Sequence, residues 1–101
     1  MEELVTPDDR TRALDALCEL SGSLFAEILE AVAVADEAKD WRADGATSMA
    51  AWLAYRYRLS HATARDWVRV AHALEELPRL RAAFATGDVS FDQLRPVSPD
   101  K

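Results

Sequence analysis

The chain has 101 residues, of which 50% are hydrophobic and 30% charged, and its formal net charge is −6. These values are typical of one folded domain, and no apolar run is long enough to cross a bilayer. The N-terminus lacks the basic and apolar segments of a signal peptide, so we expect a cytoplasmic protein without a membrane partner. One cysteine and two histidines exclude an internal disulfide and a thiolate-rich metal site, and we expect no metal or cofactor.

The charge is unevenly distributed along the chain. Residues 1–45 carry four basic and twelve acidic side chains, whereas residues 46–101 carry eight and six. A polyanion would therefore be repelled by the first half and weakly attracted by the second.

The fold class predicted from the pattern is all-α, because Ala, Leu, Glu and Arg dominate and strand signals are nearly absent. We expect a long N-terminal helix over residues 8–38 and then a compact bundle of about four short helices over 47–95. A helix-turn-helix occupies residues 48–75 of that bundle. Together these elements form a single domain over residues 1–97, and residues 98–101 form a tail or truncated linker.

The long helix begins at Thr6 as N-cap with Pro7 in the first helical position. Its apolar positions alternate threes and fours, as in a heptad seam. Ser21-Gly22-Ser23 could break it into a hairpin, but we favour one helix, because two residues of weak propensity rarely reverse a chain sharply. An unbroken helix would be roughly 45 Å long and would project from a domain with a radius of gyration of about 13 Å. Its apolar stripe would then need a partner, and Leu17, Leu24 and Ile28 are the expected interaction residues.

Short helices follow a connection over residues 39–46 that ends in the turn dipeptide Asp44-Gly45. Thr47 or Ser48 caps the next helix, and Ser60 caps the third. Ala64, Trp67, Val68, Ala71 and Leu74 form the apolar stripe of that third helix. Pro78 opens a fourth helix, Gly87 ends it, and Ser90 with Gln93 forms a capping box at the start of a fifth.

A helix-turn-helix is predicted from small Ala54 where the helices approach, apolar Leu59 in the turn and the Ser60 cap. Arg58 stands where this turn often has glycine. If that position needs a left-handed backbone, arginine tolerates it poorly, which leaves the turn geometry open.

Basic residues on this unit are the candidate DNA contacts: Arg65 and Arg69 as the main ones, with Arg56, Arg58 and His61 in support. The alternative is that the pair only packs, because many proteins that never touch DNA join two helices by a short turn. We expect Trp52 and Trp67 in the core, His61 and His72 on the surface, and Cys18 as a small packing residue. No catalytic motif stands out, so the chain by itself is not expected to be an enzyme.

A set of short motifs in order resembles the domain of unknown function 222 family over about residues 10–97. The motifs are Asp44-Gly45-Ala46-Thr47-Ser48-Met49-Ala50-Ala51-Trp52-Leu53-Ala54, Leu59-Ser60 with Thr63-Ala64-Arg65, Val70-Ala71-His72-Ala73-Leu74, and Leu77-Pro78 followed by 83–95. The resemblance implies a helical domain that often lies upstream of an HNH endonuclease domain. Members usually continue with further helices where this sequence stops, so a C-terminal nuclease domain in a longer chain is an implied partner.

Two functions are expected from these patterns. The first is a non-catalytic helical domain that helps a nuclease-type protein engage DNA. The second is a protein–protein interaction or homodimerisation module that uses the long first helix. Both can hold, because helix-turn-helix domains often bind DNA as dimers.

Overall fold

The structure, a computed structural model, describes residues 6–97. Its elements are α1 (Pro7–Glu37), the 3-10 helix η2 (Asp40–Asp44), α2 (Met49–Tyr57), α3 (His61–Glu75), α4 (Pro78–Ala85) and α5 (Phe91–Leu94). The described part contains no strand, which confirms the all-α prediction. None of its helices is long and apolar enough to cross a membrane. The tail expected at 98–101 lies outside the described residues.

The first helix is continuous, as the sequence predicted. Thr6 caps it by accepting a hydrogen bond from the backbone N–H of Asp9 at 3.0 Å, and the helix runs unbroken through Ser21-Gly22-Ser23. Gly22 does not break the helix but serves packing, because a Cβ at this position would lie 3.1 Å from the backbone oxygen of Phe84. The glycine thus allows the end of α4 to approach α1 closely.

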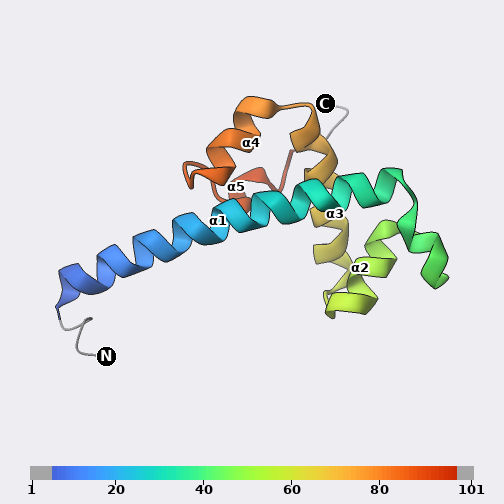
Figure 1. The fold of residues 1–101 in the computed structure, drawn as a ribbon, viewed down its shortest axis with the longest axis horizontal. Coiled ribbons are helices and arrows are strands. Elements are labelled where there is room, and N and C mark those ends of the chain that lie inside the picture. The colour runs from blue at the N-terminus through green and yellow to red at the C-terminus, as the bar shows by residue number, and fades with distance from the viewer. Residues whose placement is uncertain (1–5, 98–101) are drawn as a thin grey trace.

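The N-terminal part of α1 projects from the rest of the molecule, while its C-terminal part crosses the bundle (Figure 1). The extents are 50 × 29 × 20 Å and the radius of gyration is 16.0 Å, above the roughly 13 Å of a compact chain of this length. Ala26, Leu29, Val32 and Ala33 are buried, and all four lie in the crossing part. One helix therefore serves both as a core element and as a free arm.

Helix α3 is the centre of the bundle and packs against α1, α2 and α4. The sequence predicted one apolar stripe on α3 that did not include Val70 and Ala73. Both side chains are fully buried, so the buried surface of α3 is wider than predicted. With Ala64, Ala71 and Leu74 they give α3 an apolar surface wider than one stripe, as suits a helix with neighbours on several sides. The core around it contains Leu29, Leu53, Phe84 and Leu94.

Phe25 joins four helices through its ring contacts. Its centroid lies 5.0 Å from Trp67 of α3, 5.6 Å from Phe84 of α4 and 5.0 Å from Phe91 of α5. Aromatic pairs at such separations contribute roughly 0.5–1.5 kcal/mol beyond the area they bury. This cluster holds the short α5, which has only one turn, against α1.

The segment after α1 is more ordered than the plain connection that we expected. Lys39 adopts a left-handed backbone (φ 58°), the 3-10 helix follows, and Gly45 (φ 81°) ends it. Two indole N–H groups fasten the segment: Trp41 donates to Asp36 at 3.1 Å and Trp52 donates to Asp44 at 2.7 Å. Helix α1 and helix α2 are thereby tied to the same short element.

Candidate nucleic-acid interface

The α2–α3 unit consists of two capped helices joined by a short turn, the arrangement that the predicted helix-turn-helix requires. Ser48 caps α2 by accepting from the N–H of Ala51 at 3.0 Å, and Ser60 caps α3 by accepting from the N–H of Thr63 at 3.0 Å. Between them the N–H of Leu59 donates to the carbonyl of Ala54 at 3.1 Å. This bond is the six-residue closure of a Schellman turn. The half-buried Leu59 then packs against the core, so the turn is anchored on both sides.

Arg58 occupies the left-handed position of this turn, with φ 59° and ψ 41°. The turn therefore needs the backbone conformation that glycine adopts most easily, and arginine adopts it here. A non-glycine residue pays roughly 1–2 kcal/mol for that conformation. Such a conformation persists only where the surrounding structure imposes it, as the caps and the Leu59–Ala54 hydrogen bond do here.

Three basic side chains at this end of the molecule have no partner within the described residues. Arg58, His61 and Arg65 are exposed, and none of them makes a hydrogen bond or ion pair with another described residue. His61 and Arg65 lie one turn apart on α3, and Arg58 directly precedes that helix. We call these three residues the basic face.

Asp66, which follows Arg65 on α3, has its negative charge paired with two arginines of the same chain. Its carboxylate accepts from Arg69 at 2.8 Å and lies 3.5 Å from the guanidinium of Arg95. Asp66 is also the only acidic residue of α3 before Glu75. The first two turns of α3 thus present positive charge without a free carboxylate.

Arg69 has an internal role that sequence reasoning did not anticipate. Its Nε donates to the carbonyl of Val97 at 3.2 Å, and its Nη2 donates to the carbonyl of Arg95. With the Asp66 pair, these bonds fasten the chain after α5 to α3. The sequence carried no signal for this, because the acceptors are backbone oxygens 26 and 28 residues away.

Arg56 lies over two aromatic rings on α2. Its guanidinium carbon is 5.3 Å from the Trp52 ring centre and 6.0 Å from that of Tyr57. Such cation–π contacts orient an arginine while leaving its N–H donors available. Trp52 is half-buried against the core, as expected, and Tyr55 beside it is 91% exposed.

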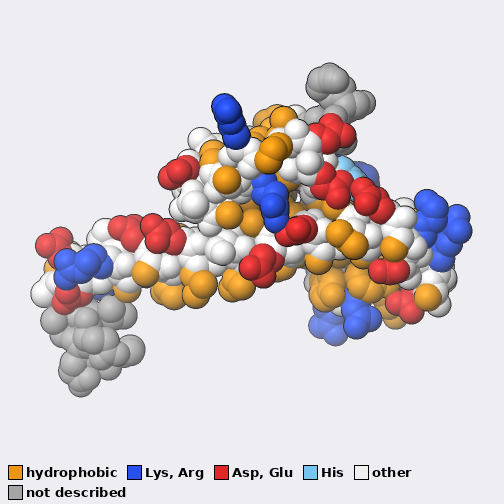
Figure 2. Space-filling model, turned by 45° about the horizontal axis from the view of Figure 1, so that its top comes forward, with side chains coloured by type: hydrophobic (Ala, Val, Ile, Leu, Met, Phe, Trp, Pro, Cys, Tyr) orange, Lys and Arg blue, Asp and Glu red, His pale blue; other side chains and the backbone are white. Residues whose placement is uncertain are grey.

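The expected interaction residues lie along one side of α1 and remain exposed. Leu17, Leu24 and Ile28 are 61%, 52% and 45% exposed, and Leu14 and Leu20 belong to the same row. Figure 2 shows hydrophobic side chains along one side of the projecting helix and acidic side chains along the other. With Phe25 and Trp67, part of this row lines a shallow groove between α1 and α3.

Cys18 was expected to pack as a small residue at the edge of the apolar stripe, and this expectation was wrong, because its side chain is exposed.

His72 also departs from the sequence expectation. We expected a surface residue without carboxylates at ligand spacing, but the imidazole is half-buried against Asp36, 2.7 Å from its Nε2, and Glu75, 3.4 Å from its Nδ1. Burial lowers the pKa of this histidine, but the hydrogen bonds and the negative charge of the two carboxylates outweigh it and raise the pKa above the usual 6.5. Glu75, three residues ahead on the same helix, was visible in the sequence, whereas Asp36 lies 36 residues away.

Comparison with known proteins gives one match. The family described as Domain of unknown function (DUF222) matches residues 6–98, which is nearly the whole chain. No curated protein and no solved structure matches it. The match extends from the N-cap of α1 past the end of α5. The chain belongs to the DUF222 family.

Proposed function

We propose that the chain is a non-catalytic domain that helps a larger protein engage DNA, with the basic face as its contact surface. The observation that carries the proposal is that Arg58, His61 and Arg65, on the predicted helix-turn-helix, have no partner among residues 6–97. In such motifs the N-terminal residues of the second helix reach base edges. His61 and Arg65 occupy these positions on α3.

The local electrostatics favour phosphate contact despite the acidic chain. The start of α3 carries the positive end of the helix dipole, and backbone N–H groups there can bind a phosphate. The acidic side chains are concentrated in residues 1–45, which lie mostly in α1 and η2. Repulsion from α1 is screened over a Debye length of about 8 Å at physiological salt, whereas contacts at the basic face are direct.

Arg65 is the main contact in this proposal, with Arg58, His61 and Arg56 in support. Arg69, expected from the sequence to contact DNA, is the weaker candidate, because its guanidinium already bonds Asp66 and two backbone carbonyls. DNA would have to compete with those bonds. We assign Arg69 a structural role instead, in which it holds the chain after α5 against α3.

The test is a fluorescence-anisotropy titration with duplex DNA at two salt concentrations. Arg65→Ala should weaken binding by about 1–3 kcal/mol if the side chain reads a base. If it holds a phosphate, binding should weaken for all sequences and the salt slope should fall by about 1. Arg79→Ala is the matched control, because Arg79 is also exposed and without a partner in residues 6–97, but lies on α4. Absence of binding at low salt, or equal losses for both variants, would refute the proposal.

A second candidate function is homodimerisation through α1, favoured by its exposed apolar row. The row follows heptad spacing and its large side chains are exposed, so a second copy could present the same row to it. The implied nuclease domain in a longer chain is a further proposal, carried only by the resemblance.

Sedimentation equilibrium separates this second candidate from a monomer. Leu17→Lys with Leu24→Lys should abolish self-association without unfolding the protein, because both side chains are already exposed. Val34→Lys is the control, since Val34 is 58% exposed on α1 but lies off the row. A wild-type protein that stays monomeric at high concentration would contradict the candidate.

A further inference from the structure

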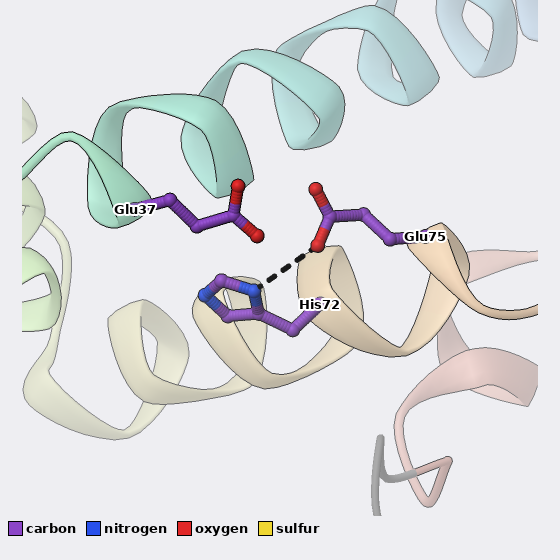
Figure 3. Close-up of side chains that lie close together, drawn as sticks. All are labelled: Glu37, His72 and Glu75. Atoms are coloured by element: carbon purple, nitrogen blue, oxygen red, sulfur yellow. Dashed lines mark hydrogen bonds and ion pairs between the residues drawn. The ribbon is translucent and has the colours of Figure 1, made fainter.

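Three side chains with metal-binding atoms converge where the end of α1 passes α3. Glu37 comes from the last turn of α1, and His72 and Glu75 lie one turn apart on α3. Figure 3 shows both carboxylates and the imidazole directed toward one another. One ligand atom from each residue lies within 4.8 Å of the others. Ligands about 2.0–2.2 Å from a common ion have separations below that limit, so small side-chain adjustments would bring all three to one cation.

The imidazole is held in a defined orientation by a carboxylate behind it. Its Nε2 lies 2.7 Å from Asp36, and the other oxygen of Asp36 accepts from the indole N–H of Trp41 at 3.1 Å. Metal-bound histidines have this arrangement, in which a carboxylate accepts the N–H of one ring nitrogen and directs the other toward the ion. Here the other nitrogen is Nδ1, which faces Glu75 at 3.4 Å.

This arrangement leaves two acceptors facing each other in the neutral form of the histidine. When Nε2 carries the hydrogen toward Asp36, Nδ1 has a lone pair that points at a carboxylate oxygen. Three carboxylates, Asp36, Glu37 and Glu75, surround this one imidazole. No lysine or arginine makes an ion pair with any of the three within residues 6–97. A divalent cation placed between Nδ1 and the glutamates would compensate this charge.

We propose that Glu37, His72 and Glu75 form a binding site for a divalent transition-metal ion, with Asp36 as the residue that positions the imidazole. One nitrogen and two carboxylate donors suit zinc, whereas magnesium prefers oxygen donors alone. The exposure of both glutamates leaves room for water in the remaining coordination positions. The ion would join α1 to α3, so its effect is on the stability of the bundle and is independent of DNA binding.

The experiment is isothermal titration calorimetry of the whole chain with zinc chloride. It uses a Cys18→Ser background, because the exposed thiol is itself a zinc ligand. We expect one bound ion per chain and an upward shift of the thermal midpoint on addition of zinc, because a ligand that binds only the folded state stabilises it. Magnesium at the same concentration should produce no comparable shift.

Variants locate the site within the chain. His72→Ala should abolish binding, and Glu37→Gln and Glu75→Gln should each weaken it by at least about 10-fold. Asp36→Asn should weaken it by about 10–100-fold, the usual effect of losing the partner of a metal-bound histidine. His61→Ala is the matched control and should bind as the parent does. Glu37 and Glu75 are exposed, so their variants should fold even if His72→Ala does not.

Two results would overturn the proposal. One is an isotherm without binding for the Cys18→Ser protein. The other is equal zinc binding in the Cys18→Ser protein and in the glutamine variants, which would place the ion elsewhere on the acidic surface.

Discussion

The projecting half of α1 and the α2–α3 unit are both exposed, but they are held in shape by different means. The arm depends on helix propensity and its N-cap, and its large apolar side chains remain in solvent. The α2–α3 unit is fixed by two serine caps, a Schellman turn and the buried side of α3. Tertiary contacts on the buried side of α3 thus support the α2–α3 unit, whereas the arm relies on the local hydrogen bonds of one helix.

The largest expected effect compares two leucines of α1. Leu29→Ala should lower the free energy of unfolding by about 2–5 kcal/mol, because the side chain is 1% exposed and its loss leaves a cavity. Leu24→Ala should cost well under 1 kcal/mol, because that side chain is 52% exposed. Urea unfolding of both variants measures the difference. Similar costs would show that the arm is covered in solution, as in a dimer.

The next effect separates two arginines of α3. Arg69→Ala should destabilise by about 1–3 kcal/mol, since it removes a charged hydrogen-bond network and leaves the carbonyls of Arg95 and Val97 without this donor. Arg65→Ala should change stability by less than about 0.5 kcal/mol, because its side chain is exposed and without a partner in the described chain. Chemical denaturation tests both. A destabilising Arg65→Ala would assign that residue a structural role.

A gain in stability is expected at the turn between α2 and α3. Arg58→Gly should stabilise the protein by about 1 kcal/mol, because glycine adopts the left-handed backbone without strain. The same variant should weaken DNA binding if Arg58 contributes to the basic face. Thermal unfolding and anisotropy on one sample check both parts. A variant that gains stability with unchanged DNA affinity would remove Arg58 from the interface.

The smallest effect concerns pH and the pair of His72 with Asp36. The folded pKa of His72 is raised above about 6.5, so its contribution is fully present below pH 6.5 and is lost as the pH rises through the folded value. The wild-type protein should therefore exceed His72→Gln in stability by more at pH 5.5 than at pH 8. Urea unfolding with a chelator present measures this. A difference that does not change with pH would show that the charged histidine contributes nothing.

Local chemistry allowed most of the fold to be predicted from the sequence. Thr6, Ser48, Ser60 and the Ser90–Gln93 capping box mark helix starts through hydrogen bonds that span three residues, so a short window of sequence contains both partners. The continuous first helix and its projection followed from heptad spacing and length. Arg56, Arg58 and His61 lie at the turn between α2 and α3, as the local pattern predicted, whereas contact of any of the five basic residues with DNA stays a prediction.

Contacts between distant segments were decided only by the tertiary structure. Burial on several sides of α3, the capture of Arg69 by the carbonyls after α5, and the meeting of His72 with Asp36 and Glu37 depend on how the helices cross. Sequence alone shows that arginine and histidine are present on one helix face. It cannot show which of them is free, because that depends on neighbours 26 to 36 residues away that the fold brings within hydrogen-bonding distance.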